Sequence, residues 1–552
     1  MSGVLIALLV VPSAVGLVGL LLGKRFAPWL AAAGSLATLI LAALLAFKVD
    51  ASAHQAAVDV SERWIPALGI RFHVAIDGLN AILVAMTSFV WLIGTVWSIR
   101  DRDTTSTPAY FFLLGLAQTA VLGAFVAQDL MLFVLCFDLM LLPFVVITAT
   151  AAGPGQDGLR PAIVMLVYTL VGSLLMLVAA VALAILSARA AQAPVTFDLA
   201  TLQTTTLSPG TQRWILAALL AAFLIKMPIA PFHGWFPAAY KAMPFPALVI
   251  FAAVLSKVAA YGLLKIALPI LPDAFVSWRL GLVILALISI LYASLVAFTS
   301  NEPRLILGYS SIAQLGFILL GITSLDPAGA QGAIFQMVTH ALVVVPAIIL
   351  VAVITERAGG VERLDQLGGL AKRAPVLTAI FLVVALAWLA MPGSGNFVAE
   401  YLVLLGSWRT SPWAAIIASI GVVLAAAYAL RFMITAMQNA RGAAIAEDSP
   451  DVGPFDAAVL GLAVGALVLV ALVPQLGLHP SESASRAAVG PAQALYDSEH
   501  PSHRPPAANA AAPEIAPAGA SNGGGDNGSG ISVQEVEPDG TTPIDSAQEP
   551  NN

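Results

Sequence analysis

Charged side chains are scarce in this sequence. Of its 552 residues only 10% are Lys, Arg, Asp or Glu, and 59% are hydrophobic, whereas a soluble globular chain carries roughly 25% charged residues. Apolar runs of about 20 residues recur along the chain, and at roughly 1.5 Å per residue each can cross a hydrocarbon layer of about 30 Å. The composition therefore predicts an all-α integral membrane protein and excludes a water-soluble globule.

Cysteine is almost absent, because Cys136 is the only one and lies inside an apolar run. One cysteine cannot form a disulfide within the chain, and it cannot supply the several thiolates that an iron–sulfur cluster or a structural zinc ion needs. The sequence also has no basic stripe of the kind that binds nucleic acid. We therefore expect no cofactor, no metal ion and no nucleic acid, and any electron transfer would take place in other chains.

The apolar runs predict about fourteen transmembrane helices separated by short polar breaks. These runs are 4–22, 28–47, 76–99, 110–127, 130–150, 161–188, 212–240, 245–268, 279–299, 304–324, 331–356, 374–406, 412–440 and 455–477. If the N-terminus lies outside the cytoplasm, most Lys and Arg of the short loops fall inside. The positive-inside rule thus predicts a multi-pass protein of the cell inner (plasma) membrane.

The composition changes after Leu478, where Ala, Pro, Ser, Gly and acidic residues replace the apolar runs. Such a segment cannot bury enough apolar surface to fold. We expect residues 478–552 to form a disordered polar tail on the extracytoplasmic side, with no further helix after 455–477.

Two of the predicted helices contain helix-breaking sequences at membrane depth. Pro228 and Pro231 lie within 212–240, and Pro392 lies within 374–406. Proline removes a backbone donor and clashes with the preceding turn, and corresponding breaks in two halves of a chain are typical of inverted-repeat transporters. We therefore predict two inverted five-helix repeats and two broken helices. The predicted parts are N-terminal helices in 1–109, a first repeat over 110–268, a second repeat over 279–440, a last helix at 455–477 and the tail 478–552.

Five ionisable residues lie inside these apolar runs, where a charged group costs at least about 2.5–3.5 kcal/mol on insertion scales. They are Asp138, Lys226, Lys257, His340 and Glu400. The simpler interpretation is that such a side chain reaches the interface or makes one structural ion pair, and that His340 is a neutral packing residue. Their depth, and the position of Lys226 and Glu400 beside the two breaks, favour a functional site.

An alternation of acid, lysine, lysine, histidine and acid across successive helices is suited to proton transfer. A carboxylate holds a nearby ammonium in its charged form, whereas an isolated ammonium in a low-dielectric site gives up its proton more readily. Moving the partner therefore moves a proton. The broken backbone at the two interruptions offers amide and carbonyl groups that can hold water between the charged groups. The pattern predicts a buried relay that handles protons and water.

Several motifs in this order resemble those of the antiporter-like subunits of respiratory complex I and of Mrp antiporters. They are Ala222 to Pro228, Pro231 to Pro237, Leu255 to Gly262 around Lys257, Tyr309 to Ser311, Gly332 to Met337 followed by His340, and Leu367 to Leu370. The resemblance covers about residues 75–440. At the second break, members similar to subunit M (subunit 4 in mitochondria) carry glutamate, whereas subunits L and N and Mrp relatives usually carry lysine. Because of Glu400, the chain most resembles subunit M.

This resemblance implies a proton-translocating membrane subunit of an NADH-quinone oxidoreductase. Such a subunit holds no redox centre and works in the lipid bilayer beside other antiporter-like membrane subunits. By the same resemblance, Asp138 and Lys226 would be the coupling ion pair, Lys257 the central relay, His340 its partner and Glu400 the exit-side group.

The sequence departs from the family pattern at three places. Asp138 stands where relatives usually have glutamate, Gln314 where many have histidine, and Ala238 to Tyr240 replace a usually acidic stretch. The first change predicts a weaker ion pair, and the second removes one titratable group. Two other functions stay open: an Mrp-type cation/proton antiporter subunit, against which Glu400 argues, and a membrane subunit of a related hydrogenase complex.

Overall fold

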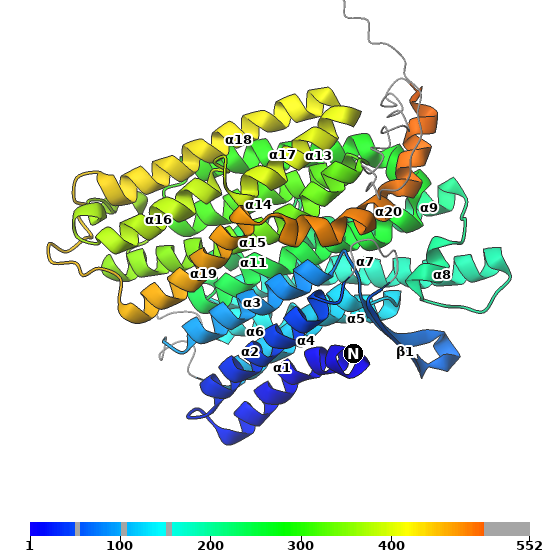
Figure 1. Ribbon diagram of the computed structural model, residues 1–552, viewed down its shortest axis with the longest axis horizontal. Coiled ribbons are helices and arrows are strands. Elements are labelled where there is room, and N and C mark those ends of the chain that lie inside the picture. The colour runs from blue at the N-terminus through cyan, green and yellow to red at the C-terminus, as the bar shows by residue number, and fades with distance from the viewer. Residues whose placement is uncertain (50–55, 101–106, 151–156, 502–552) are drawn as a thin grey trace, which may run out of the picture. The chain divides into compact units, whose positions relative to one another are not determined.

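The computed structural model describes residues 1–49, 56–100, 107–150 and 157–501. These residues belong to one compact unit, Met1–Arg504. It consists of helices and, in the part described, a single two-stranded sheet (Figure 1). The predicted fold class, an all-α integral membrane protein, is confirmed, and the sheet is an addition outside the helices.

Twelve helical segments of the described residues are long and apolar enough to cross a membrane. They are α1 (Ser2–Leu22), α2 (Ala27–Ala46), α3 (Ala81–Ser98), α4 (Pro108–Val126), α5 with α6 (Leu130–Leu139, Leu142–Thr150), α7 (Leu159–Ala191), α11 with η2 and α12 (Phe245–Gly262, Leu263–Ala267, Leu268–Ile270), α13 (Pro272–Thr299), α14 (Pro303–Thr323), α15 (Pro327–Arg357), α18 with η5 (Pro412–Met433, Ile434–Gln438) and α19 (Pro454–Leu472). Most bounds agree with the predicted ranges to within a few residues. The largest differences are at the starts of α3 and α13 and the end of α19; α13 begins at Pro272 rather than at 279.

Two further crossings are interrupted, as the sequence predicts. The first consists of α9 (Pro209–Lys226) and α10 (Phe236–Ala242), and the second of α16 (Pro375–Trp388) and α17 (Gly395–Thr410). Pro228 lies in the first gap, and the carbonyl of Leu224, which proline cannot bond, accepts the N–H of Ile229 at 3.0 Å instead. The twelve spans and these two further crossings together equal the number of crossings predicted from the sequence.

Many of these helices begin with proline in the first turn, where its missing N–H would have no helical partner in any case. A polar residue before the proline then binds a first-turn amide. Ser208 Oγ accepts the N–H of Thr211 at the start of α9, and an Asp326 carboxylate oxygen accepts that of Ala328 at the start of α15. Such caps fix where a helix begins.

A β-hairpin follows α2, in a stretch for which the sequence analysis predicted no element. β1 (Val58–Ile65) pairs antiparallel with β2 (Ile70–Ile76), and the turn contains η1 (Pro66–Leu68) and Gly69, whose φ is 72°. The hairpin lies at the end of the helices where α2 ends and where α3, α9, α13 and α15 begin. We call this end the hairpin face. The remaining short turns are α8 (Leu199–Gln203), η3 (Leu364–Gln366) and η4 (Leu370–Lys372).

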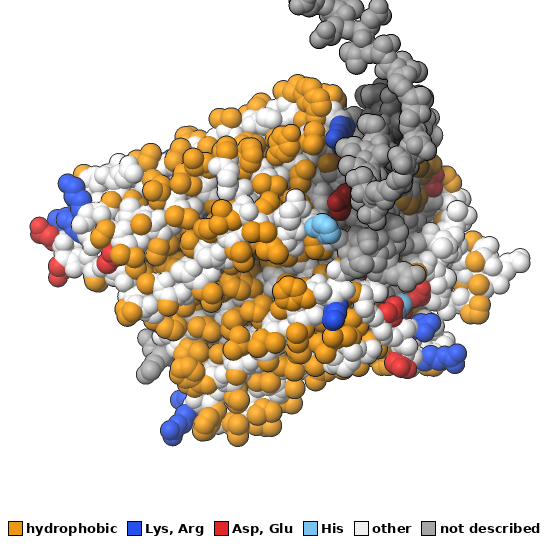
Figure 2. Space-filling view, in the orientation of Figure 1, with side chains coloured by type: hydrophobic (Ala, Val, Ile, Leu, Met, Phe, Trp, Pro, Cys, Tyr) orange, Lys and Arg blue, Asp and Glu red, His pale blue; other side chains and the backbone are white. Residues whose placement is uncertain are grey.

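The centre of the unit is formed by α11 and α15, which are buried along their hydrophobic length. α11 packs against α3, α9, α14 and α15, and α15 packs against α14 and α17. α1, α2 and α19 lie at the periphery and expose large apolar side chains (Figure 1). Figure 2 shows hydrophobic side chains spread over the visible face, with Lys, Arg, Asp and Glu mainly towards its two ends, as a surface within a bilayer requires.

The predicted disordered tail is wrong for its first part, because residues from Gln475 to Glu499 form α20. This helix packs against α15, α13 and α12. Gln331 donates to the carbonyl of Leu478 at 2.8 Å, and the Arg279 guanidinium lies 4.5 Å from the ring centroid of Tyr496. The buried residues repeat every three to four positions: Ser481, Ser485, Ala488, Val489, Ala492 and Tyr496. Because the composition of this segment is of low complexity and lacks an apolar run, the sequence did not predict the helix. Residues 502–552 lie outside the described part.

Candidate functional site

The five predicted charged residues lie on five different helices. Asp138 is in α5, Lys226 ends α9, Lys257 is in α11, His340 is in α15 and Glu400 is in α17. The last four are buried, whereas the side chain of Asp138 is 40% exposed. Because α9 packs against α11, α11 against α15, and α15 against α17, the buried four follow one another through the core.

Lys226 lies where α9 is broken. Its Nζ is 4.0 Å from Asp138 Oδ1, donates a hydrogen bond to the carbonyl of Phe137, and stands 3.7 Å from the centroid of the Phe137 ring. The ammonium is therefore held mainly by the backbone and ring of Phe137. The carboxylate is at the outer limit of an ion pair, and Asp138 Oδ1 has no hydrogen-bond partner in the structure described.

A third interruption, which the sequence analysis did not predict, separates α5 from α6 directly after Asp138. Pro143 in the first turn of α6 cannot bond the carbonyl of Leu139, although the N–H of Met140 still bonds Cys136 at 3.0 Å. Pro143 is the sequence feature that could have predicted this break. Asp138 and Lys226 thus both lie at helix ends, where the backbone can adjust.

Lys257 lies in the middle of α11 and is completely buried. Its Nζ donates to the carbonyl of Ala252 in its own helix at 3.0 Å. Among the described residues no carboxylate forms an ion pair with it. A π-helical turn, η2, follows in the same span, and such turns are frequent at functional sites. This lysine is therefore positioned without a fixed counterion.

His340 is buried in α15, within electrostatic range of Lys257. Neither of its ring nitrogens has a hydrogen-bond partner in the parts of the chain described, and the same holds for Thr339 Oγ1 and Gln336 Oε1. Buried polar groups nearly always have a partner, which is either protein or ordered water. The concentration of such groups around His340 marks a place where water can bind between helices.

Glu400 meets a pair of amides at the second broken helix. Gln314 Nε2 donates to Glu400 Oε1 at 3.0 Å, and Gln336 donates to Gln314 Oε1. Glu400 Oε2 has no partner within the residues described, and the same holds for the buried hydroxyl of Tyr428. Hydrogen-bonded side chains therefore join α15, α14 and α17.

Three neutral residues of this site, namely Gln336, Asn396 and Tyr428, are not among the site residues predicted from the sequence. Gln336 precedes His340 by four residues, so helical spacing alone could have placed it on the same face. Asn396 lies in the predicted break, and its buried amide has no partner in the described structure. Tyr428 is a buried aromatic residue of α18, and nothing in the apolar sequence around it marks it as part of the site.

α15 and α17 approach closely because glycines face the partner helix. A Cβ at Gly332 of α15 would lie 2.7 Å from the backbone nitrogen of Val403, and a Cβ at Gly395 of α17 would lie 2.8 Å from Thr339 Cγ2. Real Cβ atoms essentially never lie so close to another heavy atom. The two glycines therefore bring the His340 and Glu400 helices together.

A second charged cluster lies outside the membrane spans, on the hairpin. His73 Nδ1 is 2.7 Å from Asp198 Oδ2, and His73 Nε2 is 3.2 Å from both carboxylate oxygens of Asp59. Hydrogen bonding to Asp198, opposed by burial and assisted by Asp59, raises the pKa of His73. The same histidine lowers the pKa of Asp198 to about 2. The cluster joins β1, β2 and the segment before α8.

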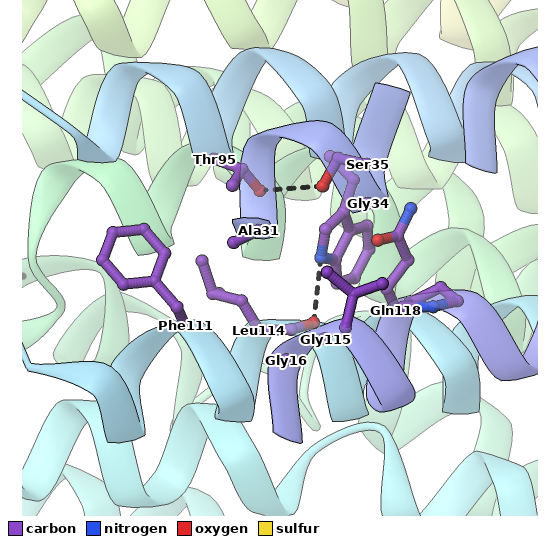
Figure 3. Close-up of a pocket in the computed structure, with 12 residues that line it drawn as sticks. Gly16, Ala31, Gly34, Ser35, Thr95, Phe111, Leu114, Gly115 and Gln118 are labelled. Atoms are coloured by element: carbon purple, nitrogen blue, oxygen red, sulfur yellow. Dashed lines mark hydrogen bonds between the residues drawn. The ribbon is translucent and has the colours of Figure 1, made fainter. Parts of the chain in front are cut away.

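A small cavity lies among α1, α2, α3 and α4, away from the charged series (Figure 3). Its volume is about 10 Å³, which is roughly the least that holds one water molecule. Ser35 Oγ donates to Thr95 Oγ1 at 3.3 Å, and the indole of Trp91 donates to the carbonyl of Leu114 at 3.0 Å. Gln118 Nε2 also faces it without a partner among the described atoms. The N-terminal helices thus have their own polar interior.

No three His, Cys, Asp or Glu side chains in the described ranges come together as metal ligands would. Within the described residues, the charged series therefore offers no site with the ligands of a metal centre.

Known proteins similar to this chain share both its sequence and its fold. Residues 127–425 match the family model described as NADH:quinone oxidoreductase/Mrp antiporter, transmembrane. NADH-quinone oxidoreductase subunit M of Pseudomonas aeruginosa is 35% identical over 423 residues, which cover 76% of this chain and 81% of that protein. Subunit M of Escherichia coli K12 is 32% identical over 427 residues, covering 76% and 83%.

Solved structures extend the similarity to three dimensions. A chain of respiratory complex I from Thermus thermophilus with bound NADH superposes with a TM-score of 0.78 at 27% identity, covering 88% of this chain and 99% of the other. A chain of the Mrp complex from Dietzia sp. superposes with a TM-score of 0.74 at 21% identity, covering 90% and 99%. At that lower identity the likeness concerns the fold alone.

Proposed function

The chain belongs to the NADH:quinone oxidoreductase/Mrp antiporter family of membrane proteins, and from this premise we propose that it is a proton-translocating subunit, of the subunit M type, in an NADH-quinone oxidoreductase. It is a multi-pass protein of the inner membrane and works beside other membrane subunits of that complex. Quinone is reduced elsewhere in the complex, and this chain carries protons.

The observation that carries the proposal is the series of buried charged and polar groups between the broken helices. Lys226, Lys257, His340 and Glu400 are buried in successive contacting helices. Burying one such group inside a membrane is expensive, and groups of this kind mark ion pathways and proton relays. A purely structural role would pair them with one another, whereas Lys257 and His340 have no ionic partner among the described residues.

The first step of the relay is an electrostatic one. With Asp138 near it, Lys226 keeps its proton; when the carboxylate moves away, the ammonium has only the Phe137 carbonyl and ring as partners, and its proton passes towards Lys257 through water. Two protonated lysines side by side would repel each other. Their charges therefore alternate, and each change at Asp138 is passed on along the series.

The second step leads from Lys257 through His340 to Glu400. Unpartnered polar atoms of His340, Thr339 and Gln336 supply binding positions for a short water chain. Gln314 cannot titrate, but its hydrogen bond turns Glu400 so that Oε2 is the oxygen available for a proton. Glu400 would thus receive the proton and release it on the exit side.

The direction of transport follows from the charges at the two ends of the helices. Lys24, Arg100, Lys241, Arg304 and Arg357 lie at the end opposite the hairpin face. The positive-inside rule puts that end in the cytoplasm. The hairpin, α20 and the C-terminal tail would then lie outside the cytoplasm, on the side that receives protons.

The assembly is tested by purifying the chain from its native membrane in mild detergent. Recovery with subunits that oxidise NADH and hold flavin and iron–sulfur centres would support the proposal. Recovery with antiporter subunits alone would replace it by an Mrp-type cation/proton antiporter. Recovery with hydrogenase subunits would assign the chain to that class of complex.

Lys226→Ala tests the relay itself. The variant should lose most proton pumping in the reconstituted complex, while electron transfer from NADH to an artificial acceptor continues. Lys241→Ala is the matched control, because Lys241 is an exposed lysine paired with Glu302 at 2.6 Å. Pumping by Lys226→Ala at the level of Lys241→Ala would show that Lys226 is structural.

A further inference from the structure

The interface between α3 and α11 carries polar side chains on the way from Lys257 to the hairpin face. The two contacting helices run antiparallel, because α3 begins at that face and α11 ends towards it. A Cβ added at Gly94 of α3 would overlap the side chain of Ile250 of α11. Thr87 precedes Gly94 by seven residues, about two turns, and Lys257 follows Ile250 by the same number. Thr87 therefore lies at the depth of Lys257, on the side of α3 that faces α11.

Asp77 and Lys265 form an ion pair at the outer end of this interface, and we call them the outer pair. Lys265 in η2 donates to Asp77 Oδ2 at 2.7 Å, and the two side chains are only 17% and 16% exposed. Asp77 Oδ1 accepts the N–H groups of Leu79 and Asn80 at 2.9 Å and 3.0 Å. Both oxygens of this carboxylate are therefore engaged, unlike those of Glu400, and neither is left open for a proton.

Asn80 joins the outer pair to two further elements. Its Nδ2 donates to the carbonyl of Ala75 in β2 at 2.9 Å and to that of Phe125 in α4 at 3.1 Å. Its Oδ1 accepts the N–H of Asp77 at 2.9 Å. The backbone before α3 is thus fixed to β2 and α4, and it holds the Asp77 carboxylate against Lys265.

Two buried hydroxyl groups lie along the interface, on the inner side of the outer pair. Tyr261 is one turn beyond Lys257 on α11, and its ring packs edge to face with that of Phe125, the centroids being 5.4 Å apart. The hydroxyl of Tyr261 and Oγ1 of Thr87 have no hydrogen-bond partner among the described residues. Buried hydroxyl groups nearly always bond to protein or to ordered water. Water bound to these two groups would extend from Lys257 towards Lys265.

A continuous water chain at this interface would bypass the second half of the relay. A proton on Lys257 would then leave at the hairpin face, or return from it, without passing Glu400. The hydrogen bonds of the outer pair leave no carboxylate oxygen free to pass that proton. In addition, a fixed ammonium at the mouth of a water path is an electrostatic barrier to an entering proton. The outer pair thus has the properties of a closure and not those of an exit.

We propose that Asp77 and Lys265 are positioning residues of the relay, whose ion pair closes a water path along α3 and α11. With this path closed, a proton on Lys257 continues to His340 and Glu400. The inference rests on the proposed function, and it assigns to the outer pair the tightness of the coupling between electron transfer and proton transport.

Proton leak from vesicles tests the closure. The purified complex is reconstituted in phospholipid vesicles that contain quinone and a pH-sensitive dye. NADH oxidation builds a proton gradient, and the decay of the gradient is followed after the NADH has been consumed. In Asp77→Ala the ammonium loses its partner and water can enter the interface. We expect assembly and NADH oxidation at the parent level, with a gradient that decays several-fold faster.

Lys265→Met provides a second variant, because it removes the ammonium while Asp77 keeps its bonds to the backbone. It should leak as Asp77→Ala does. Arg409→Ala is the matched control, since it removes another ion pair of the hairpin face, that of Arg409 with Asp326 at 3.4 Å. The control vesicles should stay as tight as those of the parent.

Thr87→Val distinguishes a defined water path from a general loss of packing. Valine has about the size of threonine but no hydroxyl group, so the double variant Asp77→Ala with Thr87→Val should leak less than Asp77→Ala alone. A leak that the second change leaves untouched would indicate disrupted packing and would overturn the proposal.

The outcomes separate this inference from the proposed function. Absence of pumping by the parent complex would overturn both. Pumping by the parent, together with parent-level gradient decay in Asp77→Ala and Lys265→Met, would leave the relay intact and overturn the closure. Reduced pumping by these variants without any leak would make Asp77 part of the proton exit, which also overturns the closure.

Discussion

The two carboxylate oxygens of Glu400 meet different surroundings. One accepts a hydrogen bond from Gln314, and the other is buried without a partner in the described structure. In the proposed function, a fixed amide on one side leaves the second oxygen as the position where a proton would be gained or lost. Gln314, read from the sequence as the loss of a titratable group, therefore has a role of its own in orienting the acid.

Glu400 variants separate proton transfer from packing. Glu400→Gln keeps the size and the hydrogen bond with Gln314 but cannot titrate, so pumping should stop while the complex assembles normally. Glu400→Asp should retain part of the pumping, as a shorter acid still titrates. Proton uptake by vesicles containing each variant is the measurement. Full pumping by Glu400→Gln would move the exit to another group.

Glu400→Lys tests the sign of the charge. Related subunits usually carry lysine at this position, so the fold should accept it. In this chain the added cation would stand in line with Lys257, and like charges oppose each other's protonation. We expect assembly at the parent level with pumping reduced at least as far as in Glu400→Gln; pumping at the parent level would mean that charge order is unimportant.

The β-hairpin contacts the membrane part through both apolar and polar groups: Val74 and Ile76 are fully buried, and His73 joins the hairpin to the segment before α8. His73 carries two carboxylate neighbours, Asp198 and Asp59, on its two ring nitrogens. Both nitrogens can donate only when the imidazole is protonated. Asp129 is nearby and accepts the N–H of Arg71 at 3.0 Å. The polar part of this attachment therefore depends on the protonation of one histidine.

The pH dependence of the hairpin follows from these pKa shifts. Because the pKa of His73 is raised, its contribution is complete below the ordinary value of 6.5 and is lost as the pH rises through the raised pKa. Because the pKa of Asp198 is lowered, its contribution is present above 3.8 and is lost as the pH falls through about 2. The hairpin is most firmly held in the weakly acidic range between these limits.

Amide hydrogen exchange of residues 58–76 measures this attachment. Corrected for intrinsic rates, exchange should be slowest near about pH 6 and rise several-fold as His73 loses its proton. His73→Gln should remove the pH dependence and exchange fast throughout. Protection that is equal in the variant and the parent at weakly acidic pH would contradict the role of the histidine.

Sequence patterns predicted the spanning helices and missed two other elements. The length of an apolar run identifies a membrane span, and proline identifies a break in it, because both are properties of a single segment of the chain. The hairpin depends on pairing between two strands of eight and seven residues. Its signal is a short alternation of apolar and polar residues rather than a long apolar run. The buried face of α20 consists mainly of small residues, which pack closely against α15. Likewise, charges in apolar runs marked Lys226 and Glu400, but neutral partners such as Tyr428 are recognisable only in three dimensions.

Seen as a whole, the described unit has two chemically different ends. One carries most of the basic loop residues, and the other carries the hairpin and α20. α20 begins directly after α19, the last spanning helix of the described residues, and therefore lies at the hairpin face. In the proposed orientation this end faces away from the cytoplasm.

A topology reporter tests that assignment. A fluorescent protein that matures only in the cytoplasm should remain dark when fused after residue 501 and should fluoresce when inserted in the loop between η5 and α19. The loop insertion is the control for expression. Fluorescence from the fusion after residue 501, with a dark loop insertion, would reverse the membrane orientation and the direction of transport.

α20 also sets a limit on the biogenesis of the protein. It follows every spanning helix of the described structure in sequence, yet it contacts α3, near the beginning of the chain, as well as α13 and α15. During synthesis the early segments enter the membrane first. The starts of α3, α13 and α15 therefore lack their contacts with α20 until residues 475–499 have been synthesised. The subunit can therefore complete this packing only after α20 has been synthesised.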